Sequence, residues 1–133
     1  MKRSAVREQL FKVLFRVEFH DLGEMDDQTR LFFESEEDEK QVSMEEVTEK
    51  LGSILSLLPE IDKLIVDHTS GWTIDRIGKV ELTILRLAVY EMKYDDAVPE
   101  SVAINEAVEL AKKYGADESS GFVNAILGKV AKA

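Results

Sequence analysis

The segment that most constrains the fold runs from Lys79 to about Tyr94. Apolar residues occupy so many helical positions there that they cover most of the circumference of a helix. They are Val80, Leu82, Ile84, Leu85, Leu87, Ala88, Val89 and Met92. A helix that is apolar on nearly every side must be enclosed, so the pattern predicts a central helix surrounded by packing partners.

The rest of the chain repeats the helical period. Apolar stripes lie within residues 4–20, 47–65, 103–114 and 122–130, and a further short helix is expected from Asp26. The two-residue alternation of a half-buried strand is nowhere sustained. The sequence therefore predicts an all-α protein.

Residues at the ends of these stripes indicate where helices begin and end. Ser4 and Asp117 are candidate N-caps of the first and last helices, and Ser43 begins a capping box. Pro59 predicts either a kink or the first turn of a new helix. Gly115 is expected at the C′ position that ends a helix.

Length and composition restrict the class of protein. The 133 residues fit one domain without room for a second sizeable core. No apolar run approaches the ~20 residues of a membrane span, and the basic amino end continues into amphipathic sequence rather than a secretory signal. Cysteine is absent, which removes disulfides, thiolate nucleophiles and Cys-ligated zinc. We expect a cytoplasmic protein.

The charge is unevenly distributed along the chain. A net charge of −10 opposes nucleic-acid binding, because Lys and Arg drive contact with phosphate. Residues 1–16, however, hold five bases and one acid, whereas residues 17–49 hold two bases and thirteen acids. A basic end beside an acidic block can steer an anion to one place. A solvated charged face without a partner explains the same distribution.

No arrangement of residues indicates catalysis. His20 and His68 lie at expected helix ends without a helical i, i+4 partner for a metal, and no glycine-rich phosphate loop is present. Carboxylates are so abundant that an acidic pair would carry no information. We expect no enzymatic activity, no metal and no cofactor.

Five polar or aromatic residues stand out within or at the ends of the expected helices. Asn105 and Asn124 are expected as buried, hydrogen-bonded amides that join helix ends. Glu81 lies in the first turn of the central helix, where the helix dipole alone favours a carboxylate. Phe122 has the spacing of a core residue, but at the rim of the preceding loop its ring could stack on an unpaired base. Tyr114 could line the same place.

A set of short motifs recurs in order along the second half of the chain. The motifs are Trp72, Gly78–Glu81, Leu85–Glu91, Val98-Pro99, Val102–Lys112, Tyr114-Gly115, Ser119, Phe122–Asn124 and Leu127. Together they resemble the NusB family of bacterial transcription antitermination factors. The resemblance is strong from about Trp72 to Val130. The first half of the chain fits only in its helix pattern and in the placement of Arg3 and Arg7.

The resemblance implies a compact domain of about seven helices in two helical subdomains, with residues 1–133 forming a single RNA-binding domain. Family members bind the boxA element of ribosomal RNA transcripts together with NusE, a small-subunit ribosomal protein. The complex helps the transcribing RNA polymerase to resist termination. Carried over, the resemblance assigns partner binding to Glu81. It assigns RNA binding to Lys2, Arg3, Arg7, Tyr114, Glu118 and Phe122.

This chain departs from the family pattern in two places. Ser4, Ala5 and Val6 separate Arg3 from Arg7, so the basic cluster is thinner than in well-known members. Residues 94–96 are Tyr-Asp-Asp where some members carry Lys or Arg. Both departures predict weaker phosphate contact by this protein alone, and hence more dependence on NusE.

Two other function classes share features of this sequence. A helical protein-interaction module with weak or lost RNA binding is the alternative, and charge reversal at Arg3 and Arg7 would separate it from an RNA-binding factor. The helical appendage of a ribosomal RNA cytosine methyltransferase is disfavoured, because that enzyme needs a catalytic domain and a nucleophilic cysteine.

The first helix offers more apolar surface than one short helix must bury, through Phe11, Phe15 and Phe19. Both a monomer and a homodimer are therefore compatible with the sequence.

Overall fold

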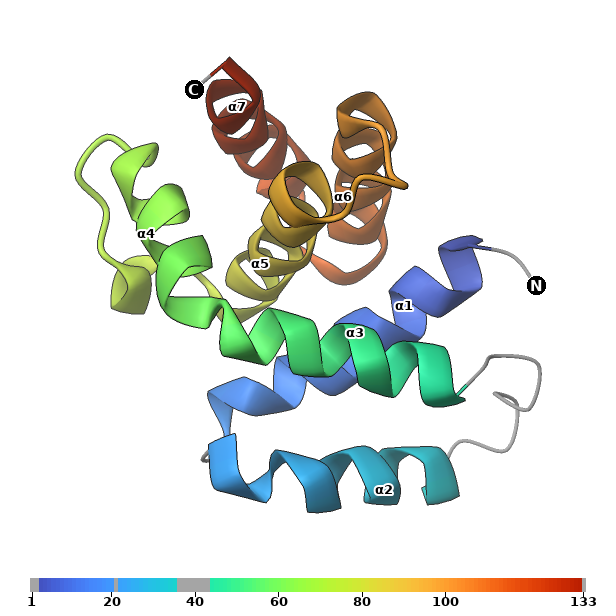
Figure 1. Ribbon diagram of the computed structural model, residues 1–133. Coiled ribbons are helices and arrows are strands. Elements are labelled where there is room, and N and C mark those ends of the chain that lie inside the picture. Colours follow the sequence, from blue (N-terminus) through green and yellow to red (C-terminus); the bar gives the residue numbers. More distant parts are fainter. Residues whose placement is uncertain (1–2, 21, 36–43, 133) are drawn as a thin grey trace. The chain divides into compact units, whose positions relative to one another are not determined.

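The computed structural model describes residues 3–20, 22–35 and 44–132, and every regular element within these ranges is helical (Figure 1). The α-helices are α1 (Arg3–Leu14), α2 (Met25–Ser35), α3 (Met44–Ser56), α4 (Leu58–Asp67), α5 (Lys79–Tyr94), α6 (Glu100–Tyr114) and α7 (Ser119–Lys132). The chain divides into two compact units, residues 1–56 and 57–133. These observations confirm the all-α fold with two helical subdomains. None of the described helices is both long and apolar enough to cross a membrane.

In the first unit, α1 packs against α2 and α3. The buried apolar side chains are Val6, Leu10, Phe11, Val13, Leu14, Met25, Val47, Leu51 and Ile54. The first helix ends at Leu14, earlier than expected, and continues as a 3₁₀ turn over Phe15–Glu18. The turn directs the later aromatics away from the core, so that Phe19 is 59% exposed while its ring lies 5.3 Å from that of Phe15.

The second unit is built around α5. Each residue from Leu82 to Met92 is buried, and α4, α6 and α7 all pack against this helix (Figure 1). The prediction of an enclosed central helix is confirmed. The apolar stripes of α4, α6 and α7 pack against α5, and their buried residues form the core of the unit around it.

An ion pair lies within this largely apolar environment. The guanidinium of Arg86 in α5 donates from Nε to Asp62 Oδ1 at 2.8 Å and from Nη2 to Asp62 Oδ2 at 3.0 Å. Arg86 is buried and Asp62, in α4, is half-buried. The two parallel hydrogen bonds fix both the distance and the orientation between the helices.

Several expected helix ends are corrected by the structure. α1 already includes Arg3, so Ser4 lies inside its first turn and is not the N-cap. The amide of Phe122 donates to the carbonyl of Glu118 at 3.2 Å, which makes Glu118, rather than Asp117, the residue preceding α7. Pro59 lies in the first turn of the new helix α4, which confirms one of its two expected roles. Ser43 lies outside the described residues.

Gly115 ends α6 for a different reason from the one expected. Its φ of −98° and ψ of −174° are extended rather than left-handed. An added Cβ would lie 2.6 Å from the Cβ of Ser119 and 2.8 Å from the carbonyl oxygen of Ala111. Gly115 is therefore required by the close approach of α7, and not by its backbone conformation.

Candidate functional site

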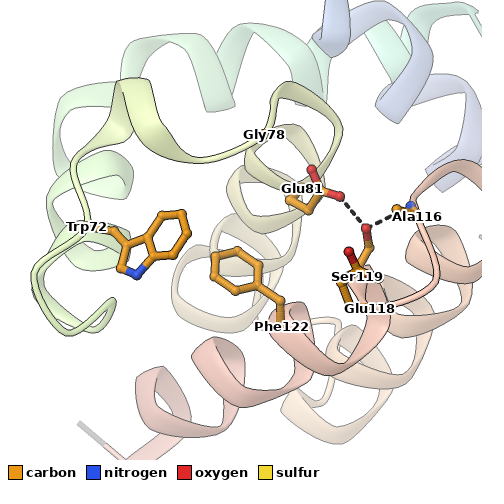
Figure 2. Close-up of a pocket in the computed structure, with 7 residues that line it drawn as sticks. All are labelled: Trp72, Gly78, Glu81, Ala116, Glu118, Ser119 and Phe122. Carbon is orange, nitrogen blue, oxygen red and sulfur yellow. Dashed lines mark hydrogen bonds between the residues drawn. The ribbon is translucent and has the colours of Figure 1, made fainter.

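A cleft of about 220 Å³ opens in the second unit beside the start of α7 (Figure 2). It is formed by the segment before α5, the first turn of α5, and the α6–α7 loop with the first turn of α7. The lining residues are Trp72, Gly78, Glu81, Ala116, Glu118, Ser119 and Phe122. Residues far apart in the sequence thus meet at one place, with aromatic rings on one side and polar groups on the other.

The aromatic side of the cleft consists of Trp72 and Phe122. Their ring centroids are 5.7 Å apart and the ring planes are tilted by 54° (Figure 2). Trp72 is 46% exposed and Phe122 is half-buried. Phe122 therefore lies at the rim, as the second of its two interpretations required, and the pair presents an apolar surface to solvent.

The polar side of the cleft is organised by Ser119. Its hydroxyl donates a hydrogen bond to Glu81 Oε2 and accepts one from the amide of Ala116 at 2.9 Å (Figure 2). Ser119 is only 3% exposed, whereas Glu81 is half-buried. We call these two hydrogen bonds the Ser119 bridge. The sequence motifs contained Ser119, but nothing in the local pattern singled it out, because its partner lies 38 residues away.

A glycine stands beside each end of the Ser119 bridge. A Cβ at Gly78 would collide with Glu81 Oε1, just as a Cβ at Gly115 would collide with Ser119. Both glycines have negative φ angles, so close approach explains them better than backbone freedom.

A tight turn carries Trp72. Ser70 and Gly71 have φ angles of 58° and 98°, in the left-handed region that favours glycine. The hydroxyl of Thr69 is shared between the carbonyl oxygens of Val66 at 2.9 Å and Trp72 at 3.0 Å, and Lys129 Nζ in α7 donates to Ser70 Oγ at 3.2 Å. These hydrogen bonds hold the backbone that carries Trp72, both within the turn and from α7.

The charges around the cleft have mixed signs. Glu81 and Glu118 supply carboxylates, and the guanidinium carbon of Arg76 lies 6.0 Å from the centre of the Trp72 ring, within the range of a cation–π contact. A hydrogen bond from the Thr73 hydroxyl, 2.6 Å from Asp75 Oδ1, lowers the pKa of Asp75 below its ordinary value. Asp75 therefore keeps its negative charge further into the acid range than an ordinary aspartate does.

The structure separates the residues that were expected around the last helix. Glu81, Glu118 and Phe122 line the cleft together, but Tyr114 does not. Tyr114 is half-buried at the end of α6, with Lys113 Nζ 5.4 Å from its ring centre. Asn105 and Asn124 are exposed, so the prediction of buried amides was wrong for both. Each faces away from the apolar stripe of its helix.

The amino-terminal bases are described only in part. Lys2 lies outside the described residues, and of Arg3 only the backbone, within α1, is described. Arg7 is 6% exposed, which differs from the accessible guanidinium that phosphate contact requires. The assignment of these residues to RNA binding stays a prediction.

The histidines lie where helices end. His68 follows α4, with Nδ1 2.7 Å from the carbonyl oxygen of Leu64, and His20 Nδ1 lies 4.0 Å from Glu24 Oε1. Among the residues that the structure describes, no group of three or more His, Cys, Asp or Glu side chains is placed to hold a metal ion.

Comparison with known sequences gives matches over almost the whole chain. The model of the family described as NusB matches residues 4–132. The transcription antitermination protein NusB of Agathobacter rectalis is 49% identical over 98% of this chain and 100% of its own length. That of Listeria innocua is 38% identical over 98% of this chain and 97% of its own length.

Solved structures give the same result. NusB of T. maritima superposes with a TM-score of 0.84 at 34% identity, covering 99% of this chain and 92% of that one. A chain from a complex of the antitermination factors NusB and NusE with double-stranded RNA superposes with a TM-score of 0.78 at 29% identity. The match covers 98% of this chain and 96% of that one.

Proposed function

This chain belongs to the NusB family of transcription antitermination proteins, and we propose that it acts by binding boxA RNA of ribosomal RNA transcripts together with NusE. The observation that carries the proposal is the similarity to antitermination proteins along essentially the full chain. The resulting complex would act on the transcribing RNA polymerase. The proposed role is one of binding, by a single domain of residues 1–133 in the cytoplasm, and it requires no cofactor.

The charges of the cleft suggest which part of an RNA strand it would receive. The carboxylates of Glu81 and Glu118 repel phosphate, but the exposed carboxylate of Glu118 can accept hydrogen bonds from the amino groups of nucleobases. The exposed faces of Trp72 and Phe122 offer a surface for base stacking, which contributes about 1–3 kcal/mol per base. Because the two rings already contact each other, a base would stack on the outside of the pair. We therefore propose that bases, rather than phosphates, enter the cleft.

Phosphate contacts would then come from Lys and Arg residues elsewhere on the chain and from NusE. Lys2 and Arg3 are the candidates in this chain, since Arg7 is buried. Two such contacts give little affinity at physiological salt, because each one releases only a small number of counterions. This supports the expected dependence on NusE, whether the protein acts as a monomer or as a homodimer.

The alternative function, a protein-interaction module with weak or lost RNA binding, has one observation in its favour. Burial of Arg7 removes one of the three amino-terminal bases assigned to RNA. Charge reversal at Arg7 would place a carboxylate in a buried position and would disturb folding. Lys2 and Arg3 are therefore the residues at which the two functions can be separated.

The test is a titration of fluorescently labelled boxA RNA with the protein, alone and with equimolar NusE, at two salt concentrations. A scrambled RNA of the same length is the control. We expect weak, salt-sensitive binding without NusE, and at least tenfold tighter binding, selective for boxA, with it. Absence of boxA binding in the presence of NusE at low salt would favour the interaction module. Equally tight boxA binding with and without NusE would contradict the proposed dependence on the partner.

A further inference from the structure

We infer that Glu81 and Ser119 are positioning residues, which hold the first turn of α7 against α5 and so set the place of Phe122 beside Trp72. This differs from assigning Glu81 to direct contact with a partner. The inference rests on the proposed function only where RNA affinity is the readout. The geometry that supports it belongs to the second unit alone.

The Ser119 hydroxyl uses both its donor and an acceptor site in hydrogen bonds. It is buried, accepts a hydrogen bond from the Ala116 amide and donates one to the Glu81 carboxylate. One side chain therefore joins the α6–α7 loop, the first turn of α7 and the first turn of α5. A buried hydroxyl needs such partners, since leaving a buried polar group unpaired destabilises the fold.

Two glycines lie against the Ser119 bridge. Gly115 ends α6, and a Cβ there would lie 2.6 Å from the Cβ of Ser119 and 2.8 Å from the carbonyl oxygen of Ala111, so a methyl group would displace Ser119. Gly78 precedes α5, and a Cβ there would meet Glu81 Oε1, the free end of the carboxylate, which would have to turn to make room. Neither glycine has a positive φ, so the approach of Glu81 and Ser119 is the feature that these two residues have in common.

The helix α7 connects the Ser119 bridge to the aromatic rings. Phe122 follows Ser119 by one turn of α7, and its amide donates to the carbonyl of Glu118. At the other side of the cleft, Lys129 Nζ donates to Ser70 Oγ in the turn that carries Trp72. Ser119 and Lys129 are about 15 Å apart along the helix. Phe122 lies between these two attachments, so moving the buried one moves its ring relative to Trp72.

The two carboxylates of the cleft also differ in accessibility. Glu81 is half-buried with its Oε2 engaged by Ser119, whereas Glu118 is exposed at the same cleft. A ligand entering from solvent reaches Glu118 first. The structure thus assigns ligand contact to Glu118 and positioning to Glu81.

Fluorescence of Trp72 tests this directly, because it is the only tryptophan of the chain. Emission is recorded from the free protein, and boxA affinity is measured in the presence of NusE. Ser119→Ala and Glu81→Ala should each change the Trp72 emission and weaken boxA binding by up to about tenfold. Glu81→Ala removes one hydrogen bond of the Ser119 bridge and Ser119→Ala removes both, and the free energy of a buried hydrogen bond sets the scale of what repositioning the rings can cost on binding. Glu81→Gln should keep both near the wild-type values, because the amide oxygen still accepts from Ser119.

The controls separate positioning from contact. Ser120→Ala removes a neighbouring hydroxyl outside the bridge and should change neither readout. The double variant Ser119→Ala with Glu81→Ala should be no worse than the weaker-binding single variant, since both remove the same bond. Circular dichroism checks that each variant is folded.

Two results would overturn the inference. If Glu81→Gln loses as much boxA affinity as Glu81→Ala while its Trp72 emission stays unchanged, the charge of Glu81 contacts a ligand directly. If Ser119→Ala leaves the emission unchanged, the bridge does not position the rings. Because emission is measured without RNA, a protein that fails to bind boxA would refute the proposed function and still decide this inference.

Discussion

At the scale of single residues, the space available to a side chain decides more at the cleft than backbone conformation does. Gly115 has an extended backbone that any residue can adopt, yet a Cβ there would lie 2.6 Å from the Cβ of Ser119. Gly121, in the first turns of α7, has nothing within 4 Å of the position of its missing Cβ. Two glycines six residues apart therefore have opposite requirements.

Replacing each of these glycines by alanine should change stability in opposite directions. Gly115→Ala should lower the free energy of unfolding by about 1–3 kcal/mol, because α7 must shift to admit the methyl group. Gly121→Ala, the matched control, should raise it by up to about 1 kcal/mol through helix propensity. Urea unfolding monitored by circular dichroism measures both. A stable Gly115→Ala variant would show that the α6–α7 loop yields more easily than its contacts indicate.

The sequence predicted some of the cleft residues and missed others for a physical reason. Glu81 and Phe122 stood out in the sequence pattern, Glu118 came from the family resemblance, and all three line the cleft. Ser119 could not be recognised as a site residue, since its partner is distant in sequence. The burial of Arg7 and the exposure of Asn105 were also missed, because helical spacing identifies an apolar stripe better than the width of the buried face.

At the scale of helices, the periodicity predicted the elements well and their ends less well. The enclosed helix α5 follows directly from its apolar circumference, and Pro59 does lie in the first turn of the new helix α4. The end of α1 could not be predicted, because an apolar stripe continues through a 3₁₀ turn as readily as through an α-helix. The exposed ring of Phe19 is a consequence of that turn.

The Arg86–Asp62 ion pair provides a test of how α4 and α5 are held together. Asp62→Ala should lower the free energy of unfolding by about 3 kcal/mol, because it removes the carboxylate that accepts two hydrogen bonds from the buried guanidinium of Arg86. Lys63→Ala is the matched control on the same helix. Lys63 is paired with Asp67 at 2.9 Å but is largely exposed, so its loss should cost no more than about 0.5 kcal/mol. Equal effects in chemical denaturation would mean that the buried pair does not fix these helices.

At the scale of the whole molecule, the net charge of −10 restricts how this protein can bind RNA. An acidic protein repels a polyanion at long range, so binding requires cations gathered at one place and a surface that receives bases rather than phosphates. Residues 1–16 hold five of the seventeen Lys and Arg residues, and the cleft supplies exposed rings beside carboxylates. The proposed function therefore requires the amino-terminal cations to bind phosphates and the cleft to bind nucleobases.

The salt dependence of boxA binding tests most directly whether the amino-terminal cations bind phosphate. In the presence of NusE, affinity is measured over a series of salt concentrations for the wild type, for Lys2→Gln with Arg3→Gln, and for Lys63→Gln with Lys132→Gln. The last variant removes the same charge at exposed positions elsewhere. Loss of two phosphate contacts should flatten the slope of log affinity against log salt by about 1.4 for single-stranded RNA, and the control should keep the wild-type slope. An unchanged slope in the amino-terminal variant would contradict phosphate binding by Lys2 and Arg3.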